Sequence, residues 1–172
     1  MPHITQHRPS TDWTCRDPVR DARSPGSQVK GQCEFCGRRL RWVHLLRHPD
    51  WPSVAEAGCC CAASLCFGYD AAAAERELIN RMARLTRFVD PKGWRPSRNT
   101  SKNICREVRM PNNRILKVTI FLNNGQYGIC VANRRGDDAY FHPMRYSSQV
   151  EAMDVAFELI ELGKEELRPS QR

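Results

Sequence analysis

The sequence predicts an α+β protein: a small cysteine-rich finger with an amphipathic helix, followed by a three-stranded antiparallel sheet packed on one helix. Three observations support this fold class. Cysteines are concentrated in the first 70 residues. Two segments have the apolar spacing of helices, and the segment before the second helix alternates apolar and polar residues between turn sequences.

Composition divides the chain into four segments. Residues 1–30 mix Pro, Ser, Asp and Arg with almost no apolar periodicity, so we expect a flexible N-terminal arm. Residues 31–90 hold the cysteine-rich module with its helix. Residues 91–113 contain prolines and many basic side chains, which predicts a basic connector. Residues 114–167 contain the sheet and the C-terminal helix.

In the first module, the apolar run at residues 40–46 predicts a short strand or hairpin. Residues 62–65 have the composition of the first turn of a short helix, which Gly68 would end. Residues 71–90 are rich in helix formers, and Pro91 stops the helix that they predict. Its apolar face consists of Leu78, Met82, Leu85 and Val89.

In the second module, strands are predicted at about residues 115–122, 127–134 and 139–146. Asn124-Gly125 provides one tight turn and residues 135–137 the next. Ser148 and Glu151 have the spacing of a helix capping box, and Gly163 is expected to end that helix. The apolar face of the helix consists of Val150, Met153, Ala156, Phe157 and Ile160.

The net charge of +8 comes mostly from residues 71–110, which carry ten basic and four acidic side chains. Such a concentration favours a polyanionic partner. No run of about 18 apolar residues predicts a transmembrane helix, and the N-terminus lacks the apolar segment of a signal peptide. We therefore expect a cytoplasmic protein, where nine cysteines favour metal-bound thiolates over disulfides.

The cysteine spacing predicts a structural zinc site. Cys33 and Cys36 are two residues apart, and Gly37 can take the positive φ of the tight turn that would hold the ion. A second cysteine group follows about twenty residues later. Within it we prefer Cys59 and Cys61, because residues two apart in an extended segment point to the same side. The predicted ligands are therefore Cys33, Cys36, Cys59 and Cys61.

At these motifs the chain resembles zinc ribbons and treble-clef zinc fingers. The resemblance covers residues 31–89, with a knuckle CEFCG, an apolar hairpin RLRWVHLL and a cysteine group GCCCA that opens a helix. It implies that Cys33, Cys36 and two cysteines between positions 59 and 66 bind zinc. Other sets remain open: Cys60 with Cys66, or a site that uses His44 or His48.

His44 and His48 lie four residues apart, but Pro49 follows at once, so the helix needed to align them as ligands is disfavoured. We predict hydrogen-bonded structural histidines. The segment VHLLRHP also resembles the hairpin of HNH nucleases, which would make His44 or His48 a general base. Because the chain has no other catalytic motif, we predict that it is not an enzyme, with a nuclease as the alternative.

The basic stretch predicts a nucleic-acid-binding surface, because phosphates are bound by distributed arginine and lysine side chains with stacking groups beside them. The candidates for this surface are Arg84, Arg87, Trp94, Arg95, Arg98, Lys102, Arg106, Arg109, Lys117, Arg134 and Arg145.

The C-terminal module is similar in topology to AP2-type and integrase amino-terminal DNA-binding domains, on the pattern Tyr140-Phe141 followed by a helix from Ser148. The resemblance implies that the exposed sheet face enters a DNA groove. Lys117, Thr119, Arg134, Arg145 and His142 would then face outward. We expect DNA in preference to RNA as the partner, and a zinc-stabilised adaptor that binds another protein as the alternative function.

Overall fold

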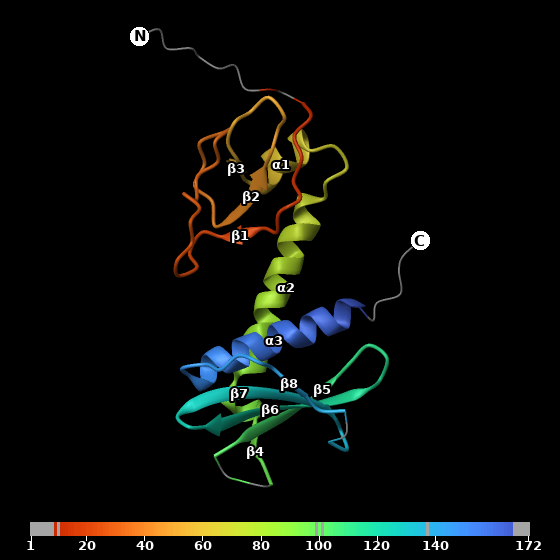
Figure 1. The fold of residues 1–172 in the computed structure, drawn as a ribbon. Helices are drawn as coiled ribbons and strands as arrows, with labels where there is room; N and C mark the ends of the chain where they lie inside the picture. Colours follow the sequence, from red (N-terminus) through yellow and green to blue (C-terminus); the bar gives the residue numbers. More distant parts are fainter. Residues whose placement is uncertain (1–8, 10, 99, 101, 137, 167–172) are drawn as a thin grey trace. The chain divides into compact units, whose positions relative to one another are not determined.

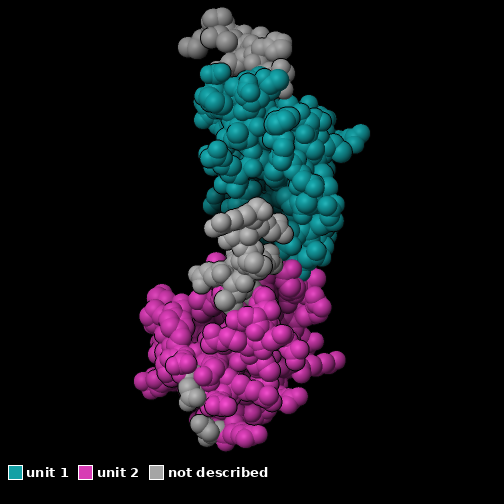
Figure 2. Space-filling view, turned by 90° about the vertical axis from the view of Figure 1, so that its right-hand side faces the viewer, with its two compact units in different colours: residues 1–81 teal, residues 82–172 magenta. Residues whose placement is uncertain are grey.

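The computed structural model describes residues 9, 11–98, 100, 102–136 and 138–166. The chain divides into two compact units, residues 1–81 and residues 82–172 (Figure 2). The division falls within helix α2 (Ala71–Val89). Helices and antiparallel sheets both occur, which confirms the α+β class. None of the helices among the described residues is long and apolar enough to cross a membrane.

The N-terminal unit is built on a small antiparallel sheet (Figure 1). Its strand order is β1 (Arg20–Asp21), β2 (Trp42–Leu46), β3 (Ala55–Ala57). The predicted apolar run thus forms the central strand. Helix α1 (Cys59–Leu65) follows directly, and α2 (Ala71–Val89) begins six residues later.

The first thirty residues are not the flexible arm that their composition predicts, over the part that the structure describes. Trp13 is buried, and its ring centroid lies 5.2 Å from that of Phe35. Thr14 exchanges two backbone hydrogen bonds of 2.9 Å with Arg47, and β1 pairs with β2. Trp13 and Val19 are the buried apolar side chains of this segment, and two apolar residues six positions apart give no periodicity to detect. Residues 1–8 and 10 of the predicted arm lie outside the described residues.

The C-terminal unit contains a larger antiparallel sheet with the order β4-β5-β6-β7-β8. After a 3-10 turn η1 (Pro91–Gly93), its strands are β4 (Arg95–Pro96), β5 (Ile104–Arg109), β6 (Ile115–Asn123), β7 (Gln126–Asn133) and β8 (Tyr140–Phe141). Helix α3 (Gln149–Glu166) lies across one face of this sheet (Figure 1).

The sheet has five strands, whereas the sequence predicted three. The predicted basic connector contributes β4 and β5, and β5 pairs with β6 over six residues. The alternation of apolar and polar residues in β5 was hidden because Arg106 lies between Ile104 and Val108 on the core side of the strand. The predicted third strand is reduced to the two residues of β8, although Tyr146 still bridges to Tyr127.

The turn between β6 and β7 is the predicted one: Asn124 and Gly125 have φ values of 49° and 77°. Positive φ at both central residues is the geometry of a tight hairpin turn. In the second predicted turn, Gly136 also has a positive φ, of 95°. Asp137, its last residue, lies outside the described residues.

Helix α3 begins with the predicted cap, since the backbone N–H of Glu151 donates to the Ser148 hydroxyl oxygen at 3.1 Å. The Glu151 carboxylate in turn accepts from the N–H of Ser147. Two details of the prediction were wrong. Val150 is exposed, and the helix continues through Gly163 to Glu166 because the glycine keeps helical backbone there.

Side chains of β6 and β7 alternate between a buried and an open face of the larger sheet. Val118, Ile120 and Ile129 face α3 and are almost completely buried with Phe157 and Ile160 of that helix. Lys117 and Thr119, which flank Val118 in sequence, therefore point to the opposite face.

Candidate metal centre and basic sheet face

The loop that carries Cys33 and Cys36 is a closed knuckle. The backbone N–H of Cys33 donates to the Arg38 carbonyl oxygen, and that of Gly37 donates to the Cys33 carbonyl oxygen, both at 2.8 Å. Gly37 has a φ of 73°, the left-handed conformation that favours glycine. The loop thereby turns both cysteine side chains to one side.

A buried carboxylate fixes this knuckle against β3. Glu56 lies in the middle of the strand, and its two oxygens accept from the N–H groups of Lys30 and Gly31 at 2.7 and 3.0 Å. The N–H of Glu34 also donates to the Glu56 carbonyl oxygen at 2.8 Å. These bonds hold the residues before and inside the knuckle, so the positions of its thiols are determined by the sheet.

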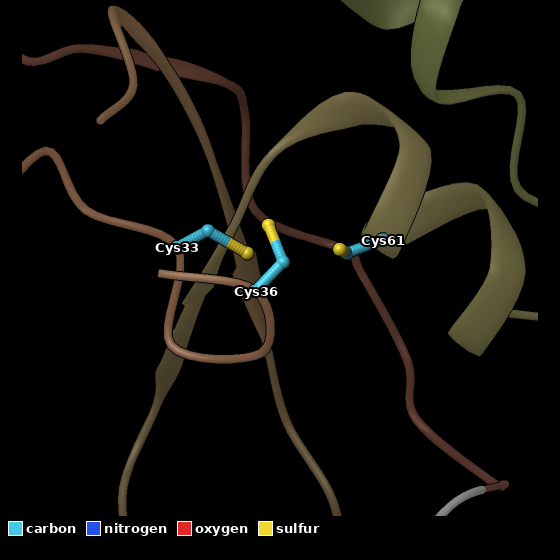
Figure 3. A group of neighbouring side chains, drawn as sticks. All are labelled: Cys33, Cys36 and Cys61. Carbon is cyan, nitrogen blue, oxygen red and sulfur yellow. The ribbon is translucent and has the colours of Figure 1, made fainter. Parts of the chain in front are cut away.

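Helix α1 brings the third cysteine to the knuckle. The sulfur atoms of Cys33, Cys36 and Cys61 all lie within 4.8 Å of one another (Figure 3). Gly58, the N-cap of α1, allows this approach: a Cβ atom there would lie only 2.7 Å from Leu40 Cδ2. These three cysteines form the knuckle cluster, which is close enough to hold a metal ion.

The thiols of the knuckle cluster differ in acidity. Burial opposes ionisation of Cys33, but backbone hydrogen bonds to its sulfur, led by that of Gly58, outweigh burial and lower the pKa of Cys33 to about 7. Burial, together with the hydrogen bonds and negative charge of Cys33 and Cys36, raises the pKa of Cys61 to about 12. A cation among the three sulfurs would relieve this repulsion, so metal binding favours loss of all three protons.

The structure brings together three of the four predicted ligands and separates Cys59 from them. The prediction assumed an extended segment, but α1 already begins at Cys59. Successive residues in a helix are rotated by about 100°, so Cys59 and Cys61 point to nearly opposite sides. The Cys59 sulfur lies instead within 4.8 Å of donor atoms of His44 and Glu75.

The alternative ligands lie elsewhere. Cys60 is exposed, whereas Cys66 is buried in the apolar core of the unit. His48 Nδ1 accepts from the N–H of Asp50 at 3.0 Å, as expected of a structural histidine. His44 is completely buried and donates or accepts at both ring nitrogens.

The open face of the larger sheet carries much of the predicted basic surface. Arg95 is paired with Cys105, and Lys117 with Glu107, so these four side chains share that face. A pocket of about 600 Å³ lies there. The cationic residues that line it are Arg95, Arg98, Lys117, Arg134 and Arg135, together with Arg106, whose place in β5 is on the core side. Glu107 is the acidic residue of the lining and lies 3.7 Å from Arg134.

Several predicted nucleic-acid residues have structural contacts instead. Trp94 is buried, and its indole N–H donates to the Phe88 carbonyl oxygen at 2.7 Å, so it does not form an exposed stacking surface. Arg84 makes two hydrogen bonds to the buried Glu161, the shorter 2.7 Å. Arg106 donates to the carbonyl oxygens of Arg87 and Phe88 at 2.9 and 2.7 Å.

The remaining predicted residues do not line this pocket. Arg87 donates from Nε to the Ala83 carbonyl oxygen within its own helix. Lys102 and Arg109 are exposed, and Arg109 lines a separate hollow with Arg84 and Arg87. Arg145 lies 5.3 Å from the ring of Phe121, and it marks an aromatic part of the same sheet face.

No protein-family model matches the chain, and no match was found among curated proteins or solved structures. The structure itself shows an α+β chain with a three-cysteine group that can hold a metal ion, and a second sheet with a basic open face.

Proposed function

We propose that the protein is a zinc-containing nucleic-acid-binding protein. Cys33, Cys36 and Cys61 hold a structural zinc ion, and the open face of the larger sheet binds the phosphate backbone of DNA. The observation that carries the second part is the convergence of cationic side chains on one pocket of that face.

Zinc is the ion that best suits the knuckle cluster. Soft thiolate ligands select zinc among the common divalent ions, and the tight loop that presents two of them is typical of structural sites. The cluster also joins the knuckle to α1, so an ion there would link two elements that the small core holds only partly. A structural role follows from this position.

The charge of the pocket favours a polyanion. Its lining contains one carboxylate and six cationic side chains, one of which, Arg106, already donates to backbone carbonyl oxygens. Among the described residues, no carboxylate forms an ion pair with Arg95, Arg98 or Lys117. Like charges held together without counterions are unfavourable, and neutralisation by phosphates would relieve this cost.

Aromatic residues continue the same surface. The rings of Phe121 and Phe141 lie 6.1 Å apart, and Phe141 is exposed. Apolar side chains can contact thymine methyl groups in the major groove of DNA, which is wide enough to admit a two-stranded ribbon. The major groove of double-stranded RNA is too deep and narrow to admit such a ribbon, and this difference favours DNA.

The test is a binding series with duplex DNA over a range of salt concentrations. Replacement of Arg95 and Arg98 by Ala should raise Kd by at least about tenfold, because charge-assisted hydrogen bonds contribute about 1.5–3 kcal/mol each. It should also reduce the salt slope by about two. Glu107→Gln should tighten binding, since it removes the negative charge from the pocket.

Arg16→Ala provides a control, because Arg16 is exposed in the N-terminal unit and does not line the pocket. It should leave Kd for DNA nearly unchanged. No binding of the wild-type protein to DNA at low salt, or equal effects of Arg16→Ala and Arg95→Ala, would reject the proposal. Duplex RNA of the same sequence should bind more weakly.

A protein adaptor is the second candidate, and exposed apolar side chains favour it. Tyr140, Phe141 and Met144 are each at least half exposed within five residues of chain. Exposed apolar groups of this kind can mark contact surfaces. Binding of a protein partner through them would depend weakly on salt and would be lost in Phe141→Ser. DNA binding would instead depend steeply on salt, and replacement of the pocket arginines would reduce that dependence.

A further inference from the structure

A second group of potential ligands lies on the other side of α1 from the knuckle cluster. It consists of His44 from β2, Cys59 from the first position of α1 and Glu75 from α2. Their donor atoms all lie within 4.8 Å of one another. Three separate elements of the N-terminal unit thus direct a nitrogen, a sulfur and an oxygen donor into one space, and we call this group the mixed cluster.

The orientation of the histidine ring suits a ligand. Nε2 faces the mixed cluster, 3.1 Å from Glu75 Oε1. Nδ1 faces away and lies 2.8 Å from the Tyr69 hydroxyl oxygen. Tyr69 also forms a hydrogen bond with the Cys15 side chain, in which the Tyr69 hydroxyl group can donate to the Cys15 sulfur. Tyr69 is then free to accept from Nδ1–H, which leaves the Nε2 lone pair directed at the cluster.

This arrangement is the one that metal-binding histidines commonly have. The ring nitrogen that does not bind the ion donates to a neighbouring oxygen, which fixes the tautomer and the ring plane. The Tyr69 ring adds a steric constraint, since it lies edge-on to the imidazole with centroids 5.6 Å apart. The histidine is therefore fixed in position without any contribution from Glu75 or Cys59.

The separations also suit an ion. Adjacent donors of a tetrahedral zinc site lie roughly 3.3–3.8 Å apart, from bond lengths of about 2.0–2.3 Å. The distance of 3.1 Å between His44 Nε2 and Glu75 Oε1 is close to this value, and the 4.8 Å limit on the other pairs requires only small side-chain rotations. Cys59 and Glu75 are partly exposed, so an ion can enter from their side.

We propose that His44, Cys59 and Glu75 bind a second divalent ion of the zinc and cobalt class. Imidazole, thiolate and carboxylate together suit such borderline ions. Three protein donors leave one tetrahedral position for water or another small ligand. This site is independent of the proposed DNA-binding surface, and its ion differs from that of the knuckle cluster in having one thiolate instead of three.

The competing interpretation is that Glu75 only satisfies the buried imidazole by a hydrogen bond and that Cys59 is incidental. Metal stoichiometry separates the two. We would remove metal from the protein, titrate it with cobalt(II) and count bound ions by native mass spectrometry. The wild-type chain should bind two ions. Binding of a single ion that is lost in Cys36→Ser would place that ion at the knuckle cluster and would overturn the proposal.

Two variants then test the assignment of the second ion. Glu75→Gln keeps a group that can hydrogen-bond to His44 but replaces the carboxylate with a weak ligand. Cys59→Ser replaces the single thiolate. Each should weaken binding of one cobalt ion by at least about tenfold and leave the other unchanged. For Cys59→Ser, the spectrum should also lose the thiolate-to-cobalt charge-transfer intensity of that ion.

Cys60→Ser is the matched control, because Cys60 is exposed and adjacent to Cys59 but belongs to neither cluster found among the described residues. It should bind two cobalt ions with wild-type affinity. Circular dichroism of each variant checks that α2 is retained. Two ions bound with unchanged affinity by both Glu75→Gln and Cys59→Ser would show that the second ion is elsewhere, which also overturns the proposal.

Discussion

Each of the two units has its own core, and the two cores differ in the size of the side chains that they bury. The N-terminal unit buries mainly small residues around one tryptophan, including Ala55, Ala57, Ala62 and Cys66. The C-terminal unit buries large ones, among them Phe88, Ile120, Ile129, Phe157 and Ile160. Because apolar stabilisation scales with buried area, the first unit needs a further source of stability that the second does not. The knuckle cluster and the mixed cluster both occur in the unit with the smaller core.

The largest expected effect is therefore on the N-terminal unit when the proposed zinc ion is removed. Chelation, or Cys33→Ser, should unfold residues in β2, β3 and α1, because the binding energy of a structural zinc ion, about 10–16 kcal/mol in small domains, acts as folding energy. Hydrogen exchange measured for each unit checks this. Protection in β6 and β7 should not change.

Cys60→Ser is again the control for this change, since its thiol is exposed. Unchanged protection of β2 after complete removal of metal would show that the small core is sufficient. The contrast between the two units would then have to be explained by packing alone.

The next largest effect is expected in the core of the C-terminal unit. Phe157→Ala removes a buried ring that packs with Phe88 at a centroid distance of 5.6 Å, and it should destabilise this unit by about 3–5 kcal/mol. Denaturant unfolding in the presence of zinc, monitored by hydrogen exchange in β6, measures this loss of stability. Leu162→Ala, at an exposed position of the same helix, should change stability by less than about 0.5 kcal/mol.

Trp13→Ala tests whether the N-terminal segment belongs to the first unit. The indole is buried against Phe35, and its N–H donates to the Pro9 carbonyl oxygen at 2.9 Å. We expect a loss of about 3 kcal/mol in the N-terminal unit and faster proteolysis before β2. A change within the range of an exposed substitution would restore the interpretation of residues 11–30 as a loose arm.

The smallest predicted effect concerns the start of α3. Ser148→Ala removes the oxygen that accepts from the N–H of Glu151 and should cost about 1 kcal/mol. Ser148→Asp keeps an acceptor at the same position and should restore most of this stability. Thermal unfolding of the two variants makes the comparison, and equal melting temperatures would show that the cap contributes little.

The sequence predicted most of the elements whose periodicity is regular. Helix α2 and strands β6 and β7 lie within a residue or two of their predicted limits, because their apolar residues recur at the spacing of helices or hairpin strands. Strand β5 was missed because Arg106 occupies an inward position and packs its guanidinium 5.3 Å from the Phe88 ring. Local alternation cannot reveal a strand whose inward position is charged.

The candidate metal ligands were only partly predictable for a related reason. Cys33 and Cys36 lie in one turn, so their spacing alone brings them together. The choice between Cys59 and Cys61 depends on where α1 begins, and boundaries are poorly determined by local sequence. Glu75 and Tyr69 were not recognised, since they reach His44 only through the packing of α2 and the loop before it. No spacing in the sequence signals that contact.

The three consecutive cysteines of α1 also constrain the register of that helix. Cys59 lies with the mixed cluster, Cys61 lies with the knuckle cluster, and Cys60 points to solvent. A slip of one residue in one direction would place Cys60 at the knuckle cluster but Gly58 at the mixed cluster. A slip in the other direction would place Cys60 at the mixed cluster but Ala62 at the knuckle cluster. Either cluster alone tolerates one such slip, and only the pair together specifies a single register.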